Sequence, residues 1–246
     1  MQTFAIQVGF LLAILALWQL AAVNRWVSPL LLPSLGDTLG RVTRVLGTPG
    51  AYESLRVTLL EFVAALGLAL VCGLGVGAVL GTSRYFGALL EPIVLALYAV
   101  PIVMAFPLCI LFFGIGSSSK IAFAALYAFF PIAIQTMKGL RHVDPSLVRA
   151  AIALGASRRQ LLVQVRLPAA FPVVIVGVRL GAVLGLLSVV AGEMLGGLAG
   201  IGQALTRAVQ TFESAEAFAW ILVIVALVTL LNIGLGWLEH RVVGDT

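Results

Sequence analysis

The chain has 246 residues, of which 61% are hydrophobic and only 10% charged. A soluble globular domain carries roughly 25% charged residues, so this composition excludes a soluble protein and predicts an integral membrane protein. The apolar runs are continuous and do not alternate with period two, which indicates an all-α polytopic chain and excludes a barrel. The net charge of +5 comes from basic residues scattered over the loops. That pattern is typical of membrane orientation and not of nucleic-acid binding.

Six apolar segments predict about six transmembrane helices in a single domain covering residues 1–246, because a helix needs about 20 residues to cross a bilayer. The segments are 4–23, 57–81, 88–113, 119–137, 169–195 and 217–238. The first lacks a basic n-region and is longer than a signal-peptide core, so we expect it to be retained. Small residues at four-residue spacing predict close helix packing in the second and fifth segments, at Gly73, Gly75, Gly77, Gly81, Gly177, Gly181 and Gly185.

The third segment contains Pro92, Pro101 and Pro107, each of which removes a backbone donor and disrupts a helical turn. We expect a kinked helix there, which either lines a passage or is a bent packing helix. The connector 24–56 contains the amphipathic run DTLGRVTRVL, which is typical of a segment lying along the membrane interface. The Gly-rich stretch GGLAGIGQALTRAVQTFES predicts a short-helix or irregular excursion after the fifth segment.

Six spans place both termini on one side, together with the loops 82–87 and 138–168. That side carries eight basic residues, and the other side carries six, namely Arg25, Arg41, Arg44, Arg56, Lys120 and Arg207. Cytoplasmic loops carry the excess of Lys and Arg, so the termini and the loop 138–168 are expected to be cytoplasmic. The expected orientation rests mainly on the concentration of basic residues in the loop 138–168.

The loop 138–168 has the pattern of two short helices. In DPSLVRAAIALG, Asp144 can cap a helix, Pro145 suits its first turn and Gly155 its stop. ASRRQLLVQVRLP predicts a second amphipathic helix, with Pro168 marking the turn into the fifth span. A small helix with an alanine face either enters a groove on another protein or lies on the membrane surface. The residues by themselves leave both interpretations open.

This loop resembles the EAA loop of binding-protein-dependent ABC importer permeases, whose pattern is E-A-A, three residues, Gly, nine residues, then I-x-L-P. Two positions depart from it: Arg149 stands where the family usually has Glu, and Val165 replaces Ile. The reversed charge puts in doubt any contact that the family's Glu makes with its ATPase. The positions that match, with the correct spacing, are Ala150, Ala151, Gly155, Leu167 and Pro168.

The resemblance implies a type I ABC importer permease fold, in which a second permease subunit, here expected to form a homodimer, completes the membrane part. It also implies a cytoplasmic ABC ATPase dimer that binds the ATP and Mg²⁺, and an extracytoplasmic solute-binding protein, with no cofactor on this chain. The residues then expected to contact the ATPase are Leu147, Arg149, Ala150, Ala151, Leu154, Gly155, Arg158, Arg159, Leu167 and Pro168.

PIVMAFPLCILFFGIG, the Gly-Val-Arg-Leu around Arg179 and AGEMLGG around Glu193 are similar to the nitrate, sulfonate and taurine importer branch. This wider resemblance covers about residue 52 to the C-terminus. It implies a multi-pass protein of the bacterial inner membrane that moves a small, often anionic solute by alternating access. The residues expected to line the path are Pro101, Pro107, Arg179 and Glu193.

Four charged residues, Glu61, Glu91, Arg179 and Glu193, lie in or near the apolar runs. Ionised groups in a bilayer face protein or water, because burial in lipid costs at least ~2.5–3.5 kcal/mol. Arg179 and Glu193 are fourteen residues apart, about 21 Å along one helix, so Arg179 needs a partner on another helix or subunit. Arg179 either lines an anion path or pairs structurally. Glu193 either lines a gate or lies at the interface, and Glu91 is expected at the cytoplasmic interface.

Two other classes of function fit less well. The only histidines are His142 and His240, no cluster predicts a metal site or a catalytic centre, and no GxxxxGK[ST] loop occurs, so an enzyme is not expected. Cys72 and Cys109 fall inside apolar runs and are expected to be packing residues. A stand-alone secondary transporter or channel is the alternative, but it would need coupling carboxylates at mid-membrane and would leave the loop unexplained.

Overall fold

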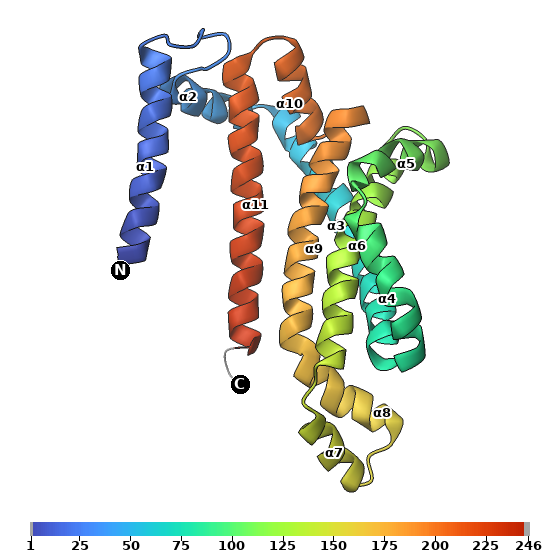
Figure 1. The fold of residues 1–246 in the computed structure, drawn as a ribbon. Helices are drawn as coiled ribbons and strands as arrows, with labels where there is room; N and C mark the ends of the chain where they lie inside the picture. Colours follow the sequence, from blue (N-terminus) through green and yellow to red (C-terminus); the bar gives the residue numbers. More distant parts are fainter. Residues whose placement is uncertain (1, 244–246) are drawn as a thin grey trace.

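The computed structural model describes residues 2–243, and every regular element within them is a helix. The centre consists of α3 (Pro49–Thr82), α6 (Ser117–Arg141) and α9 (Leu167–Gly196), and α11 (Ser214–Val243) lies beside α9 (Figure 1). In this part of the chain four helices are long and apolar enough to cross a membrane, or five if a bent pair counts as one span. α1 (Gln2–Val23) is a further apolar helix. The expected total of six spans remains a prediction.

Glycine stripes bring the three central helices together. A Cβ atom at Gly77 would lie 2.6 Å from the Ala133 carbonyl oxygen on α6, and one at Gly181 would lie 2.8 Å from the Ala128 carbonyl oxygen. α3 and α9 therefore both touch the α6 backbone directly. Close packing of this kind holds helices together in a bilayer, where the hydrophobic effect does not drive their association. The predicted close packing is confirmed for the stripes on α3 and α9, except at Gly75, where a Cβ would meet nothing within 4 Å.

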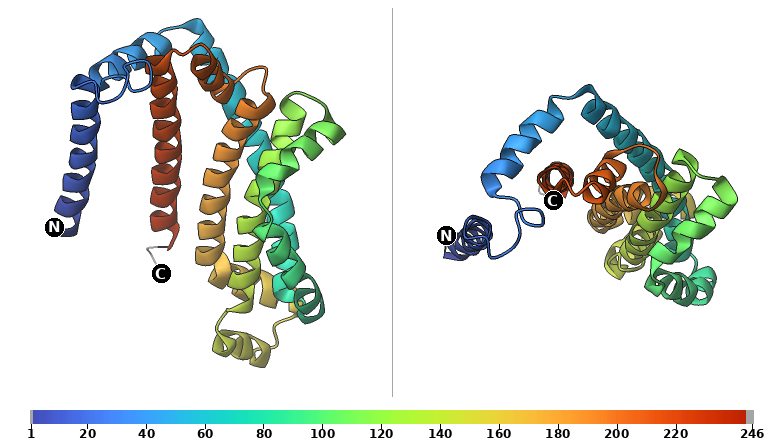
Figure 2. Two further views of the ribbon diagram at one scale, coloured as in Figure 1. Left: turned by 45° about the horizontal axis from the view of Figure 1, so that its top comes forward. Right: turned by 90° about the horizontal axis from the view of Figure 1, so that it is seen from above.

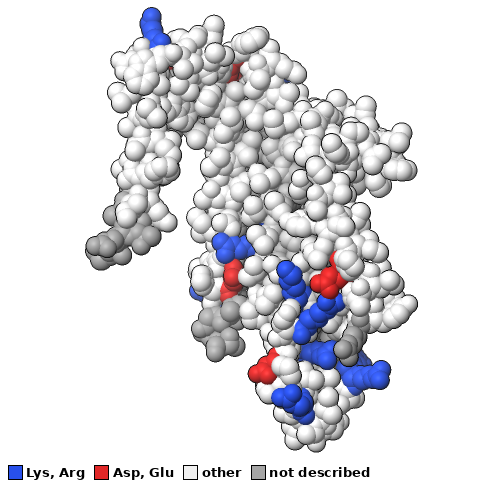
Figure 3. Space-filling model, in the orientation of Figure 1, with Lys and Arg blue, Asp and Glu red and all other residues white. Residues whose placement is uncertain are grey.

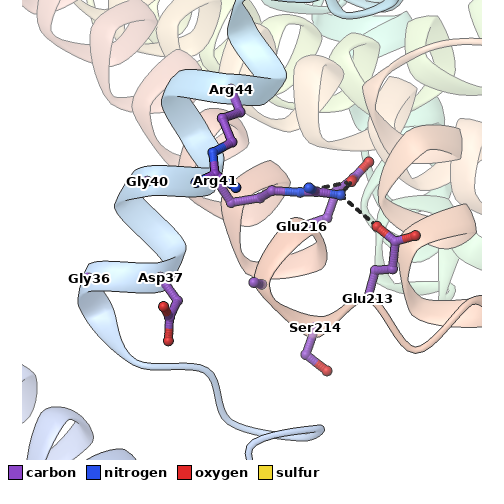
Figure 4. A pocket seen from close by; sticks show the side chains of 9 residues that line it. Gly36, Asp37, Gly40, Arg41, Arg44, Glu213, Ser214 and Glu216 are labelled. Carbon is purple, nitrogen blue, oxygen red and sulfur yellow. Dashed lines mark hydrogen bonds and ion pairs between the residues drawn. The ribbon is translucent and has the colours of Figure 1, made fainter.

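α1 and α2 (Leu35–Leu46) extend from this centre on one side (Figure 2). α2 crosses the end of the molecule that also carries α10 (Ile201–Gln210), which we call the α10 end. Arg41 on α2 forms ion pairs with Glu213, at 2.7 Å, just before α11, and with Glu216 in the first turn of α11 (Figure 4). The amphipathic helix expected in DTLGRVTRVL is confirmed, and its place along a membrane interface remains a prediction.

The segment 88–113 was expected to be one kinked helix, and this is wrong. It forms two helices joined by a sharp turn. α4 (Arg84–Ala99) ends before Pro101, a 3₁₀ turn η1 (Ile102–Ala105) follows, and α5 (Phe106–Phe113) leaves at 88° to α4. The reason lies at Val100, whose extended backbone (ψ 136°) suits a residue that precedes proline and breaks the helix. Pro107 then occupies the first turn of α5, where its missing N–H costs nothing.

Pro168 does not mark a turn into the fifth span, contrary to expectation. The helix runs unbroken from α8 (Arg158–Gln160) through a π-helical segment η2 (Leu161–Arg166) into α9. A proline ring clashes with the carbonyl four residues earlier in an α-helix, and the wider π turn before Pro168 relieves that clash. The predicted amphipathic helix and the predicted span are thus one element.

The opposite end of the molecule carries α7 (Pro145–Ala153) and α8, and we call it the α7 end. The N-terminal end of α1 and the C-terminal end of α11 both point toward it (Figure 1). On the face shown in Figure 3, most charged side chains gather at this end and the middle of the molecule is almost free of them. This distribution matches a chain whose uncharged middle lies in a bilayer.

Candidate functional site

The loop at the α7 end has the two predicted helices, with the predicted caps. Asp144 accepts a hydrogen bond from the Ser146 N–H at 2.7 Å, and Gly155 adopts φ +81°, a conformation that favours glycine at a helix stop. The Ser146 bond holds the pKa of the Asp144 carboxyl below its ordinary value, and nearby Arg149 acts in the same direction. Ser157 and Gln160 then form a capping box that starts α8. Local hydrogen bonds therefore set where the helices of this loop begin and end.

α7 projects beyond the helical bundle and buries none of its own residues (Figure 1). Leu154 at its tip is 89% exposed, and Leu147 and Ile152 are also exposed. Val148 and Ala151 are half-buried, and Val148 packs on the cluster around Val143. We call the exposed residues Leu147, Arg149, Ala150, Ile152 and Leu154 the α7 surface. An apolar surface on a free-standing helix outside the bundle is typical of a binding site for another protein.

Of the other residues expected to contact the ATPase, some lie next to the α7 surface and two lie farther along the chain. Arg158 and Arg159 are exposed at the start of α8, just after Gly155, while Ala151 is half-buried. Leu167 and Pro168 are exposed at the junction of η2 and α9, seven or more residues farther along the helix. Arg149 forms no ion pair with another described residue, so its charge is available to a partner.

A second polar site lies inside the bundle near the α10 end. The ammonium Nζ of Lys120 on α6 is 2.6 Å from Oε1 of Glu61 on α3, and each side chain is 3% exposed. The same Nζ lies 3.5 Å from the Ala199 carbonyl oxygen. The pair thus fixes two central helices to each other and to the turn after α9. We refer to Thr58, Glu61, Lys120 and Glu193 as the buried ionic cluster.

Glu193 and Thr58 complete this cluster by capping α10. The first amides of a helix have no partner within it, and the N-cap residue Gly200 has no side chain to supply one. The Gly202 N–H instead donates to Glu193 Oε2 at 2.8 Å, and the Ile201 N–H donates to the Thr58 hydroxyl oxygen at 3.0 Å. That hydroxyl donates to Glu193 Oε1 at 2.6 Å. A carboxylate at a helix N-terminus is also favoured by the helix dipole.

The cluster changes two expectations from the sequence. Lys120 was expected as a loop charge, and this is wrong: it lies in the first turn of α6 and is 3% exposed. Glu193 is 1% exposed within this chain, and its expected place on the translocation path remains a prediction. The sequence did contain a signal for the pair. Glu61 and Lys120 each lie near the start of a span that enters from the same side, so their depths match.

Arg179 has the partner on another helix that was expected. Its guanidinium donates to Glu239, at 2.9 Å, and to Asn232, at 2.8 Å, both on α11. These residues line a groove of about 340 Å³ between α9 and α11. Pro101 and Pro107 are exposed beside the α4–α5 turn, away from that groove. The structure therefore does not bring the four expected path residues together within one chain, and their role remains a prediction.

Glu91 on α4 was expected at an interface, and it lies at the α7 end. Its carboxylate forms an ion pair with Arg141, the last residue of α6, and both side chains are about one-third exposed. The Arg141 guanidinium also donates to the Leu80 carbonyl oxygen of α3 at 3.2 Å. The loop thus begins at a residue that contacts two other helices.

Comparison with known proteins agrees with this architecture. Residues 62–244 match the family model described as binding-protein-dependent transport system inner membrane component. The chain is 32% identical over 241 residues to a taurine transport system permease protein of Escherichia coli, covering 96% of this chain and 88% of that protein. It is 32% identical to a putative aliphatic sulfonates transport permease protein of Bacillus subtilis, covering 93% and 83% of the two chains.

A riboflavin transport system permease protein of Chloroflexus aurantiacus is 34% identical, with 95% of this chain and 87% of that protein covered. An inward-facing methionine ABC transporter structure superposes with a TM-score of 0.68 at 21% identity, covering 83% of this chain and 97% of that chain. The fold is therefore that of a type I ABC importer permease, as expected. The chain belongs to the binding-protein-dependent transport system inner membrane components, as a permease subunit of an ABC importer in the inner membrane and not a stand-alone transporter.

Proposed function

We propose that the α7 surface docks onto a cytoplasmic ABC ATPase dimer, whose closure it passes to α6 and α9. The observation that carries this proposal is the free-standing α7 helix, which buries none of its residues and presents Leu154 at its tip. A small apolar helix of this kind suits a groove on a partner. The loop is joined without a break to α9 through η2, and to α6 through three residues. The ATPase supplies the ATP and Mg²⁺ site, and both termini of this chain are cytoplasmic.

We further propose that two copies of the chain form the membrane part. α1 carries exposed apolar side chains from Ile6 to Val23. It meets α11 near the α10 end, where the Trp18 and Phe218 rings lie 5.2 Å apart, and its ribbon lies apart from the central helices (Figure 2). Its few polar contacts with the rest of the chain are at its C-terminal end, such as the bond from the Trp18 indole N–H to the Pro33 carbonyl oxygen at 3.0 Å. A second copy would cover these faces.

The cargo of this permease is a small anionic solute, with a sulfonate as the favoured class. Support comes from the names of the taurine and sulfonate relatives and from Arg179 on a groove in the membrane-spanning part. The riboflavin relative is similarly close, so an extracytoplasmic binding protein is expected to select the solute. Identifying which ligand stabilises that protein would test the class directly.

Leu154→Glu tests the docking proposal. A buried apolar anchor at an interface contributes about 2 kcal/mol or more, so we expect association with the ATPase to weaken roughly 30-fold. Co-purification of the tagged permease with its ATPase measures this. Leu198→Glu is the matched control, because Leu198 is 78% exposed at the α10 end and should leave association unchanged. Undiminished association of Leu154→Glu would exclude docking through the α7 surface.

Arg149→Glu tests the charge that departs from the family pattern. If an acidic residue of the ATPase faces Arg149, reversal places two like charges together and weakens association by about tenfold. The effect should shrink at high salt, because such rim charges are screened. Arg241→Glu makes the same charge change on α11 at the same end and should have no effect. An unchanged affinity for Arg149→Glu would show that position 149 faces solvent.

A further inference from the structure

We call the loop 138–168 the docking loop. Arg141 lies where this loop leaves the helical bundle. It is the last residue of α6, separated from α7 by the three residues 142–144, and its side chain contacts two helices that precede it in the chain. One guanidinium nitrogen donates to the Leu80 carbonyl oxygen in the last turn of α3, and the other pairs with the carboxylate of Glu91 on α4. A single side chain therefore joins α3, α4 and α6 at the base of the loop.

The first turn of α4 leaves room for this side chain. Gly87 is buried, and a Cβ atom there would overlap the Arg141 guanidinium and the Leu80 carbonyl oxygen. Any other residue at position 87 would therefore displace the guanidinium from its place between Leu80 and Glu91. This steric requirement is independent of the charge pair and points to the same contact.

The other packing of α4 on α6 is apolar. Val94 packs on the cluster around Phe130, and the Tyr98 and Phe130 rings lie 5.7 Å apart. Such contacts resist separation but allow one helix to slide or rotate on the other. Glu91 is the only acidic residue of α4, so its pair with Arg141 is what fixes the helix in register with the loop. Beyond α4 the chain continues through the Pro101 break into α5.

We propose that Arg141 is a positioning residue for transport: it makes α4 move as one body with the docking loop, so that ATPase closure reaches the α4–α5 turn as well as α6 and α9. This inference rests on the proposed docking of α7. It gives Arg141, Glu91 and Gly87 a role in passing ATPase closure to α4. None of these three residues belongs to the loop motif or to the expected path residues.

The test measures one distance in the assembled complex of permease, ATPase and binding protein. Spin labels are placed at Leu89 on α4 and Val163 on η2, both exposed, in a Cys72→Ser/Cys109→Ala background. In the otherwise wild-type chain we expect the same distance distribution without nucleotide and with ATP plus vanadate. Arg141→Met and Gly87→Ala, which break the contact by different means, should each make the distribution shift between the two states.

Two further variants make the outcome decisive. Lys138→Met removes a positive charge one turn earlier on α6, where the side chain is exposed, and should behave like wild type. Arg141→Glu combined with Glu91→Arg restores the pair but not the Leu80 bond, so it should recover the fixed distance in part. A complex that assembles and keeps a fixed distance in both Arg141→Met and Gly87→Ala would overturn the inference. Failure of the wild-type permease to bind the ATPase would instead overturn the proposed docking.

Discussion

Lys120→Met is expected to lower the free energy of unfolding by about 3–5 kcal/mol, the loss that follows when one partner of a buried ion pair is removed. Glu61 would be left 2% exposed with no counter-ion, and apart from Lys120 neither of its carboxylate oxygens has a polar partner among the described residues. Thermal or denaturant unfolding of the permease in detergent measures the change.

A double variant distinguishes the loss of the two charges from the loss of the volume that the two side chains fill. Glu61→Met combined with Lys120→Met replaces both charges by apolar groups of similar volume, which is often neutral or stabilising, so most of the loss should be recovered. Glu53→Gln, which breaks the exposed Arg56–Glu53 pair on α3, should cost less than about 1 kcal/mol. A double-variant loss equal to the sum of the losses in Lys120→Met and in Glu61→Met alone would mean that the two charges do not interact.

Glu193→Ala is expected to release the N-terminus of α10. The Gly202 N–H would lose its acceptor in a buried position, at about 1–3 kcal/mol. The Thr58 hydroxyl would lose Glu193 as well, but it can still donate to the Ser54 carbonyl oxygen at 3.0 Å. Hydrogen exchange measures this locally, and the amides of the first turn of α10 should lose protection before the rest of the helix does. Glu193→Gln retains a carbonyl acceptor and should lose less.

The same pair of variants decides between the two interpretations of Glu193. If the carboxylate lines the path, Glu193→Gln removes its charge and alters uptake while the amides of α10 stay protected. If it only caps α10, uptake should follow protection in both variants. Thr58→Val is the companion variant, because it removes the other cap while leaving the carboxylate in place. Full protection of α10 in Glu193→Ala would contradict the capping role altogether.

Patterns within a few residues of one another predicted the elements of this protein well. The caps at Asp144 and Gly155 and the amphipathic α2 depend on local hydrogen bonds and periodicity, which a sequence displays directly. The glycine stripes also predicted that the second and fifth segments would pack closely, but not that both would pack on α6. The prolines were harder to interpret, since Pro101 broke a helix while Pro168 was absorbed by a π segment. A proline can end a helix or be accommodated within it, and the surrounding packing decides which of the two occurs.

The sequence by itself determined that this is a helical membrane protein and, through the loop at 149–168, that it belongs with ABC importer permeases. Only the tertiary structure decided which charges meet. Lys120 and Glu61 are 59 positions apart, and Arg141 and Glu91 are 50 apart. The physical reason is that a charge in a membrane protein is satisfied by whatever helix lies at its depth, and depth and neighbour are set by how the glycine-lined helices pack.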